Sequence, residues 1–406
     1  MKVLLINTKY QGGGAEKVAR QLYQGLPTYG VQTAFLAGRN RGQESDVPAI
    51  YSSFGRRAWN YANRKLHNNA IRHDAYAVKQ ILRCIEQEQP DIVHFHNVHG
   101  HYMGIADIAK IAAVRPVVWT LHDMWALTGH CCICIDDCTA WYENGCAHCD
   151  KLGTYSQLRR DASADLLRLK KMTFAGKGIY FVTPSRWLEE RIRNSYLGDE
   201  NIRTICNGVD TTRFRYLDKA EIKKKYGISQ HKKALMFLGT ALDNEIKGIR
   251  YLIRALELLP DKETYFLLMV GDCSQLGRIK EAFAHKDFGY VKDTDLLNEI
   301  YAAADLFIFP SVHESAGLMA VESGASGTAC VAFDSEGIPE AVTEDVGWLV
   351  PRREAEKMSS CIQTAFADRE RLRIKGQHFR QTVEQMFSLE RMLRQYAELY
   401  GEVVKE

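Results

Sequence analysis

The stretch ESAGLMAVE, residues 314–322, decides how this chain is interpreted. An apolar run at 305–310 precedes it, and a small-residue segment at 323–327 leads to a second apolar run at 329–333. This order predicts strand, helix and strand, with Glu314 on the first turn and Glu322 inside the helix. Ligands of open parallel sheets bind at the edge where the strands end, so a binding site is favoured over two ordinary surface glutamates.

Gly317 stands between the two carboxylates, where the predicted helix begins. A glycine there lets backbone N–H groups approach an anion, and a helix N-terminus carries about half a positive charge. Carboxylates beside a phosphate site require a ligand with a second kind of group. A sugar nucleotide supplies both, because its hydroxyls suit the acids and its diphosphate suits the amides.

Apolar strand candidates alternate with amphipathic helix candidates along the whole chain, which is typical of βαβ units and parallel sheets. The predicted strands are 2–6, 33–37, 91–95, 117–121, 179–183 and 202–206 in the first half, then 234–239, 265–271, 305–309, 329–333 and 347–350. The predicted helices include 15–26, 249–259 and 296–304.

Length and composition indicate a globular protein of two domains. The 406 residues suit two domains of about 200 residues each. Lys and Arg number 53 against 50 Asp and Glu, far from the basic excess of a nucleic-acid-binding protein. No apolar run approaches the roughly 20 residues of a membrane span, and the short first apolar run reads as a strand. We expect a cytoplasmic location and mostly reduced cysteines.

Several motifs together resemble family 4 glycosyltransferases of the GT-B arrangement, over nearly the whole chain. They are Glu-x7-Glu at 314–322, GGGAE at 12–16, WTLHD at 119–123, NGVD at 207–210 and KG at 247–248. The run HFHNVHG at 94–100 and the cysteines that follow are similar to a subgroup that makes bacterial exopolysaccharide of the colanic-acid type. The resemblance implies an α/β protein with two Rossmann-like domains facing each other across a cleft, and a C-terminal helix that returns to the first.

The expected domains are an acceptor-side domain at 1–210, with a Cys-rich insert near 129–150, and a nucleotide-sugar-binding domain at 211–385. Residues 386–406 are expected to form the returning helix, because apolar residues recur at helical spacing from Leu389 onward.

The resemblance implies an enzyme that moves a hexose from a nucleotide-diphosphate sugar to a glycan or lipid-linked acceptor. The setting would be bacterial surface polysaccharide synthesis, including lipopolysaccharide, and the donor a UDP- or GDP-sugar. Transfer with retention of configuration is expected, by a front-face route without a catalytic divalent ion. The alternatives are a non-catalytic partner subunit of the same fold, a nucleotide-sugar epimerase or a phosphorylase, although no pyridoxal-phosphate lysine pocket is apparent.

In the second half, Lys247 is expected to neutralise the diphosphate as a point charge. By resemblance, Glu322 accepts hydrogen bonds from the ribose hydroxyls, and Glu314 lies beside the transferred sugar. Further donor contacts are assigned to the backbone of Ala316, Gly317 and Leu318, to the loop that contains Val291, and to Gly13 and Gly14. The family often has an Arg where this chain has Thr240, and Arg250 is only a weak substitute.

In the first half, His122 and Asp123 end a predicted strand, and by resemblance they join Glu314 in the catalytic group, with His122 contacting the donor sugar across the cleft. His96, His99 and Trp125 are expected to bind the acceptor. A metal site among the nearby histidines is a less favoured interpretation, and His94 fits a buried strand residue almost equally well.

Six of the 11 cysteines fall between Cys131 and Cys149. The C-x2-C pair at 146–149 is suited to binding one tetrahedral Zn²⁺, with two further sulfur ligands from cysteines earlier in the chain. The resemblance selects Cys131, Cys138, Cys146 and Cys149 as the ligands of a structural zinc, with Cys132 and Cys134 as extra cysteines. Free thiols and an iron–sulfur cluster are the competing interpretations.

The segment 54–72 combines basic and aromatic residues, among them Arg56, Arg57, Trp59 and Tyr61. Such a segment is suited to resting on anionic lipid, which predicts peripheral contact with the inner face of the cell membrane. A solvated helix or loop near the acceptor site explains the composition almost equally well.

Overall fold

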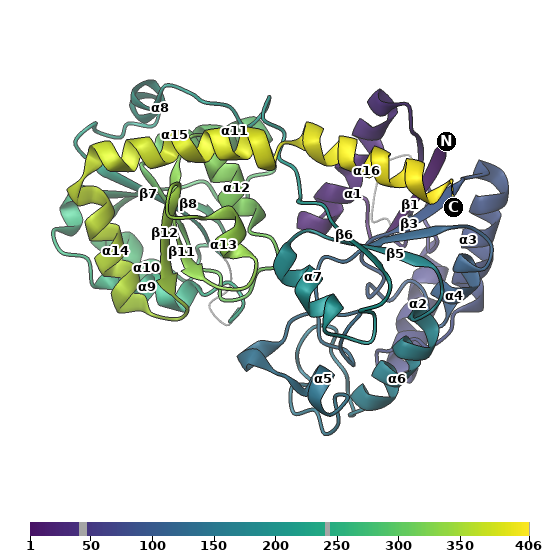
Figure 1. The fold of residues 1–406 in the computed structure, drawn as a ribbon. Helices are drawn as coiled ribbons and strands as arrows, with labels where there is room; N and C mark the ends of the chain where they lie inside the picture. Colours follow the sequence, from purple (N-terminus) through teal and green to yellow (C-terminus); the bar gives the residue numbers. More distant parts are fainter. Residues whose placement is uncertain (40–46, 240–243, 406) are drawn as a thin grey trace. The chain divides into compact units, whose positions relative to one another are not determined.

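A computed structural model describes residues 1–39, 47–239 and 244–405, and it divides the chain into two compact units. The first unit contains Met1–Cys206 together with the C-terminal segment from Met392, and the second contains Asn207–Arg391 (Figure 1). Each unit is built around one six-stranded sheet. All strand pairs in both sheets are parallel, so the predicted α/β class is confirmed.

The first sheet has the strand order β2-β1-β3-β4-β5-β6. Its strands are β1 (Lys2–Asn7), β2 (Gln32–Ala37), β3 (Ile92–Phe95), β4 (Val117–Thr120), β5 (Ile179–Thr183) and β6 (Asn201–Thr204). Its helices are α1 (Gly14–Gly25), α2 (Phe54–Leu66), α3 (Ala75–Glu88), α4 (Asp107–Ala112), α5 (Ala140–Glu143), α6 (Ser163–Phe174) and α7 (Arg186–Arg193), with short 3₁₀ turns at Leu26–Tyr29 and Ile135–Asp137. The strand order reverses direction between β1 and β3.

The second sheet has the strand order β12-β11-β10-β7-β8-β9, and the reversal falls between β7 and β10. Its strands are β7 (Lys233–Gly239), β8 (Tyr265–Gly271), β9 (Ala284–Asp287), β10 (Leu306–Phe309), β11 (Ala329–Asp334) and β12 (Gly347–Pro351). The helices are α8 (Lys219–Lys225), α9 (Ile249–Glu257), α10 (Gly277–Ala282), α11 (Thr294–Ala303), α12 (Leu318–Ala325), α13 (Ile338–Ala341), α14 (Ala355–Ala367) and α15 (Arg369–Met386), with a 3₁₀ turn at Lys262–Thr264.

The apolar strands are buried on both faces, as expected for parallel sheets that helices cover. Val3, Leu4, Leu5 and Ile6 of β1 are all 0% exposed, which explains why the sequence shows a continuous apolar run there. Every strand predicted from the sequence coincides with a strand of the structure. The prediction missed β9, because its sequence Ala-His-Lys-Asp is polar and lies largely exposed at the sheet edge.

The last helix, α16 (Leu389–Val403), begins in the second unit and continues into the first. Its Tyr400 hydroxyl lies 2.7 Å from His94 Nδ1, and its Tyr396 hydroxyl lies 2.8 Å from Thr120 Oγ1. Leu393 packs so close to Gly25 that a Cβ there would lie 2.4 Å from the leucine Cδ1. The predicted return of the C-terminal helix to the first domain is therefore confirmed.

Among the described residues, no helix combines the length and the apolar character that crossing a membrane requires.

Candidate functional site

In the second unit, Lys247 and Glu314 meet at the point where the strand order reverses. Lys247 lies before α9, on the connection from β7, and Glu314 follows β10. Lys247 Nζ lies 2.8 Å from Glu314 Oε2, and both side chains are only partly exposed, at 35% and 20%. Ligands of open parallel sheets bind at such a reversal, outside the carboxyl ends of the strands. The predicted carboxylate and ammonium groups therefore lie together at this reversal.

A glycine is required next to Lys247. Gly248 has a φ of +63°, and a Cβ there would lie 2.0 Å from the carbonyl oxygen of Pro310. The two loops also pair through their backbones, because the Val312 N–H donates to the Ile246 carbonyl over 2.8 Å. This close approach of the two loops sets the position of the lysine relative to Glu314.

Helix α12 starts immediately beyond Glu314, with Gly317 at its N-cap in the left-handed conformation (φ +61°). The backbone of Ala316, Gly317 and Leu318 therefore lies where the free N–H groups of the helix begin. Glu322 lies inside this helix and is 6% exposed. The Tyr301 hydroxyl approaches its Oε2 at 3.5 Å, and burial together with the Glu322 charge raises the pKa of Tyr301 well above its ordinary value.

Glu336, which the sequence analysis missed, fixes the backbone of Glu314. Its Oε2 accepts from the Glu314 N–H at 2.7 Å, and its Oε1 lies 2.8 Å from His313 Nδ1. The Gly337 N–H donates back to the Glu314 carbonyl over 3.0 Å. Glu336 holds a φ of +51°, which is uncommon for a residue with a side chain. The sequence did offer one signal for Glu336: it precedes a glycine shortly after a predicted strand, where binding residues are common.

Val291 lies in the loop after β9, at the same sheet edge but away from the Lys247–Glu314 pair. The order β7-β8-β9 puts its strand two positions from β7, a distance of about 10 Å across the sheet. Thr240 lies outside the described residues. Arg250 pairs with Glu245, with Nη1 3.2 Å from Oε1 of that residue, and its Nη2 donates to the Tyr251 hydroxyl at 3.0 Å.

In the first unit, the glycine loop and the histidine run follow the two strands at the reversal, β1 and β3. Gly13 is the N-cap of α1, and Gly14 is its first residue. The Thr8 hydroxyl donates to the Asn97 carbonyl over 2.7 Å, which ties the ends of the two strands together. The candidate residues of this unit therefore occupy the position where its sheet would bind a ligand.

His96 and His122 face each other at the ends of β3 and β4. His96 Nδ1 lies 3.0 Å from His122 Nε2, and the two rings stack with centroids 5.3 Å apart. Burial lowers the pKa of His122 to about 4 and that of His96 well below its ordinary value. Both rings are therefore neutral at pH 7, and one can donate a hydrogen bond to the other. His94 is fully buried between Tyr400 and Thr120, a structural position.

Asp123 is held by His99 and by the backbone of Trp125. His99 Nε2 lies 2.8 Å from Asp123 Oδ2, and the Trp125 N–H donates to Oδ1 over 2.9 Å. Burial alone would raise the pKa of Asp123, but His99 and this N–H hold it below its ordinary value. Asp123 is thus ionised at pH 7. The structure brings together His99, Asp123 and Trp125, and it also places the Cys132 sulfur within 4.8 Å of the first two.

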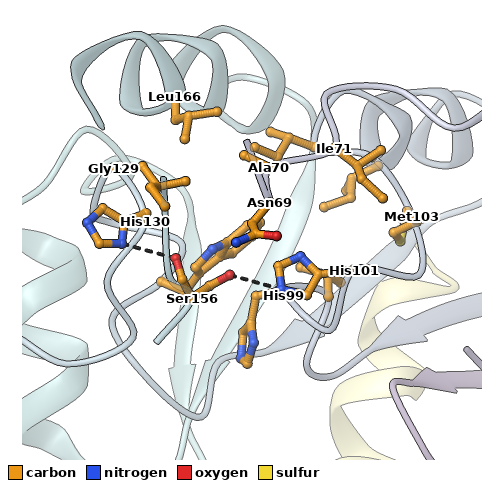
Figure 2. Close-up of a pocket in the computed structure, with 16 residues that line it drawn as sticks. Asn69, Ala70, Ile71, His99, His101, Met103, Gly129, His130, Ser156 and Leu166 are labelled. Atoms are coloured by element: carbon orange, nitrogen blue, oxygen red, sulfur yellow. Dashed lines mark hydrogen bonds between the residues drawn. The ribbon is translucent and has the colours of Figure 1, made fainter. Parts of the chain in front are cut away.

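A small hollow opens behind His99 (Figure 2). Its lining includes Asn69, His99, His101, Trp125 and Ser156. The hollow has room for about 30 Å³ of solvent, which is enough for one or two water molecules but too little for a sugar ring. Asn69 Oδ1 and His99 Nδ1 are buried there without a hydrogen-bond partner from the protein, so ordered water fits this hollow.

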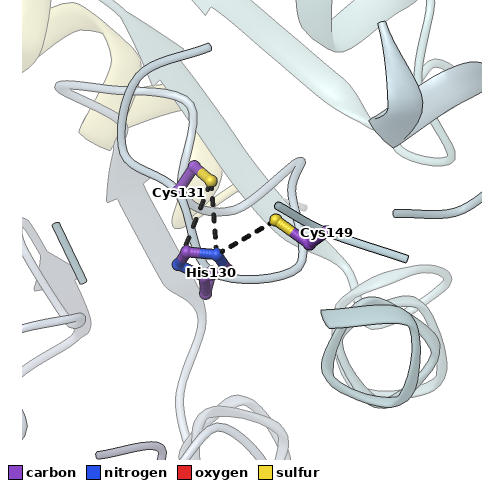
Figure 3. Close-up of side chains that lie close together, drawn as sticks. All are labelled: His130, Cys131 and Cys149. Atoms are coloured by element: carbon purple, nitrogen blue, oxygen red, sulfur yellow. Dashed lines mark hydrogen bonds between the residues drawn. The ribbon is translucent and has the colours of Figure 1, made fainter. Parts of the chain in front are cut away.

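The predicted zinc cysteines are brought together around a second hollow of the first unit. Cys131, Cys138, Cys146 and Cys149 all line it, together with His130 and Cys134. His130, Cys131 and Cys149 present their ligand atoms within 4.8 Å of one another (Figure 3). Burial raises the pKa of Cys131 to about 11 and that of Cys146 above its ordinary value. Cys132 points away from this group, toward His99 and Asp123. His130 directly precedes the first of these cysteines, but it was not predicted as a ligand from the sequence.

Both halves of the chain match models of known glycosyltransferase families. Residues 12–213 match a model described as Glycosyltransferase Family 4, and residues 232–368 match one described as Glycosyl transferases group 1. WcaC of Escherichia coli K12, named as a colanic acid biosynthesis glycosyl transferase, is 24% identical over 98% of this chain and 99% of its own length.

Two solved structures share the whole fold. Sucrose-phosphate synthase from Thermosynechococcus elongatus has a TM-score of 0.74 at 18% identity, covering 99% of this chain and 98% of its own. HepE from Anabaena, solved in complex with UDP, has a TM-score of 0.71 at 17% identity, covering 99% of this chain and 100% of its own. The family models, the end-to-end relative and the shared two-sheet architecture lead to one conclusion: the chain belongs to the family 4 glycosyltransferases of the GT-B fold.

Proposed function

We propose that this glycosyltransferase moves a hexose from a UDP- or GDP-sugar to a glycan or lipid-linked acceptor in bacterial surface polysaccharide synthesis, with retention of configuration. The observation that carries the proposal is the Lys247–Glu314 pair at the strand reversal, next to the α12 N-terminus and Glu322. The name of WcaC supports the polysaccharide setting, and the UDP complex of HepE supports a nucleotide donor.

The second unit is proposed to hold the donor. Lys247 supplies a point charge to the leaving diphosphate, and the N–H groups at the start of α12 supply further donors. Glu322 accepts hydrogen bonds from the ribose hydroxyls, in place of its long contact with Tyr301. The loop that contains Val291 holds the base. Because Lys247 can stabilise the developing charge, we propose that transfer needs no catalytic divalent ion.

The first unit is proposed to hold the acceptor and part of the catalytic group. A neutral His122 donates or accepts a hydrogen bond, whereas Asp123 provides a fixed negative charge. His96, His99 and Trp125 orient the acceptor, whereas Gly13 and Gly14 allow close backbone approach to the donor. The departing phosphate accepts the proton of the acceptor hydroxyl, so the protein acts by positioning and by charge stabilisation.

Replacing Glu314 with Gln tests the catalytic assignment. Gln keeps the shape but removes the negative charge, so we expect turnover to fall at least about 100-fold while nucleotide affinity stays within about 3-fold. Turnover is measured as transfer or slow hydrolysis of nucleotide sugars, and affinity as the thermal shift with UDP and GDP.

Glu281→Gln on the exposed end of α10 is the matched control, and its turnover should be unchanged. An undiminished rate in Glu314→Gln removes Glu314 from the catalytic group. A wild-type chain that neither transfers nor hydrolyses any nucleotide sugar favours the non-catalytic partner. Conversion of the donor to its epimer favours the epimerase.

We also propose that α2 rests on anionic lipid. Its outward face carries large apolar side chains, Phe54, Trp59, Tyr61 and Leu66, which are 80%, 62%, 58% and 80% exposed. Basic residues of the same helix flank this face: Arg56, Arg57, Arg64 and Lys65. An exposed apolar face beside several cations is typical of helices that lie in the membrane interface.

Vesicle sedimentation tests the contact of α2 with lipid. The protein should sediment with vesicles that contain phosphatidylglycerol, less with pure phosphatidylcholine and less at high salt. Trp59→Ser combined with Leu66→Ser should reduce binding about 10-fold or more, because it removes two exposed apolar groups. Met172→Ser, at an equally exposed apolar residue of α6, should bind as the wild type does. Equal binding by the double variant would contradict the proposal.

A structural zinc held by the Cys-rich loop completes the proposal. The cysteines at 131, 138, 146 and 149 share one hollow, which supports a common ion. Bound zinc would fix a loop that has only two short helical segments, Ile135–Asp137 and α5. Metal analysis of protein purified without chelators tests it, and the absence of zinc would overturn it.

A further inference from the structure

His130 turns one ring nitrogen toward two sulfurs of the Cys-rich loop. Its Nε2 lies 3.5 Å from Cys131 Sγ and 3.5 Å from Cys149 Sγ (Figure 3). The side chain is buried, with 2% of the residue exposed, so these contacts are not those of a solvated surface histidine. A neutral nitrogen and two thiols are gathered on one side of the hollow.

These separations fit a shared tetrahedral zinc ion. With Zn–N near 2.0–2.1 Å and Zn–S near 2.3 Å, tetrahedral angles place a nitrogen and a sulfur ligand about 3.5 Å apart. Both His130 distances have this value. The Cys131 sulfur also lies 3.9 Å from His130 Nδ1, so this thiol has to rotate toward the Nε2 side when the ion binds.

The other ring nitrogen of His130 is held in the manner of a metal ligand. Nδ1 lies 3.1 Å from the Ser156 carbonyl oxygen, which can only accept, so Nδ1 carries the proton and Nε2 presents its lone pair. The Ser156 N–H in turn donates to the His130 carbonyl over 3.3 Å. Zinc-binding histidines commonly donate their second N–H to a backbone carbonyl in this way, which fixes the tautomer and the ring orientation.

Cys146 is the sulfur best placed to be the fourth ligand. Its Sγ accepts the N–H of Gly129, the residue before His130, at 3.2 Å. This bond ties the sulfur to the backbone that directly precedes His130 and would stabilise a thiolate. One imidazole and three thiolates on Zn²⁺ also leave a single net negative charge, whereas four thiolates leave two. The smaller charge costs less to bury.

We propose that His130, Cys131, Cys146 and Cys149 form a mixed His-Cys₃ zinc site, with Cys138 as a neighbour rather than a ligand. The inference rests on the proposed structural zinc and replaces Cys138 by His130 among its four ligands.

X-ray absorption spectroscopy of the zinc-loaded wild type, together with its metal content, tests the inference without any substitution. We expect one zinc per chain, coordinated by three sulfurs and one nitrogen. One zinc with four sulfurs would overturn the role of His130 and leave the structural zinc intact. Absence of zinc would overturn both.

Variants provide an independent readout. His130→Ala should lower zinc affinity at least about 100-fold, since it removes a direct ligand. His130→Cys should retain zinc and shift the absorption of the cobalt-substituted protein toward a four-sulfur spectrum. Cys138→Ser should retain one zinc with an unchanged spectrum. His148→Asn, at the exposed histidine of the same loop, is the control and should match the wild type. Loss of zinc in Cys138→Ser but not in His130→Ala would refute the assignment.

Discussion

Lys170 shows how a single residue of α6 supports the loop that follows β4. The side chain is fully buried, and its Nζ donates to the carbonyls of Trp125 and Thr128 at 2.6 and 2.9 Å. The ammonium also lies 3.6 Å from the centre of the Trp125 ring, a cation–π distance. Burial lowers the pKa of Lys170 to about 7, although the nearby Cys132, Cys146 and Asp123 act to raise it. Lys170 therefore fixes the turn that separates Trp125 from His130.

Lys170→Met should destabilise the protein by about 2–4 kcal/mol, because it leaves two buried carbonyl groups without a donor. Urea unfolding at pH 7.5 measures the free energy of unfolding. Lys171→Met changes the next residue of the same helix, which is exposed, and should alter this free energy by less than about 0.5 kcal/mol. Equal effects of the two substitutions would show that Lys170 does not hold the turn.

At the scale of elements, the candidate residues are placed by tight turns at the ends of strands. β7 and β10 bring Lys247 and Glu314 to one edge, and their turns approach so closely that Gly248 has no room for a Cβ. Glu336, in the turn after β11, accepts a hydrogen bond from the backbone of Glu314 and so holds the turn after β10 in place. The turn at the end of each of these strands thus holds the candidate residues of the adjacent turn in place.

Gly248→Ala should destabilise the second unit by more than the roughly 1–2 kcal/mol cost of a left-handed φ, because the added Cβ would meet the Pro310 carbonyl. Donor affinity should fall with it as Lys247 moves away from Glu314. Gly401→Ala is the control, since Gly401 lies within helix α16 and a Cβ there meets no atom within 4 Å. It should be neutral or slightly stabilising. Thermal unfolding with and without UDP measures both effects, and equal losses in the two variants would contradict the account.

At the scale of the whole molecule, the first unit is assembled from both ends of the chain. Helix α16 supplies Tyr400 to His94, so a residue near the C-terminus completes a buried polar group between β3 and β4. Burial lowers the pKa of several histidines there and nearby: His94 and His101 to about 3, His122 to about 4, and His96 well below its ordinary value.

These histidines make the stability of the protein depend on pH. The unfolded chain takes up their protons near pH 6.5, whereas the folded chain resists protonation until about pH 3–4. The stability is therefore fully present above pH 6.5 and is lost as the pH falls below it, by up to about 1.4 kcal/mol per pH unit for each histidine.

Urea unfolding at pH 7.5, 6.0 and 5.0 should show this decline. His94→Gln should reduce the slope by one proton, whereas His378→Gln, at an exposed residue of α15, should leave it unchanged. A slope that is the same in His94→Gln as in the wild type would contradict the assignment.

Much of this protein was set by local patterns that the sequence displays directly. The alternation of apolar strands and amphipathic helices determines the α/β class, because buried parallel strands read as continuous apolar runs. The spacing of Glu314, Gly317 and Glu322 determines a turn followed by a helix start, since both are short-range features. β9 was not predicted from the sequence, because a short, exposed edge strand needs no apolar residues.

Tertiary structure alone decided which of these local features meet. Strand order brought Lys247 to Glu314 across 67 positions of the chain, and the packing of helix α16 on the first unit brought Tyr400 to His94 across 306. Glu336 and His130 acquire their partners only through loops that fold against one another, and a linear pattern does not encode such contacts. The physical reason is that a sequence specifies its own strand, turn or helix, whereas hydrogen bonds and ion pairs between distant residues depend on the order in which the strands are placed in the sheet.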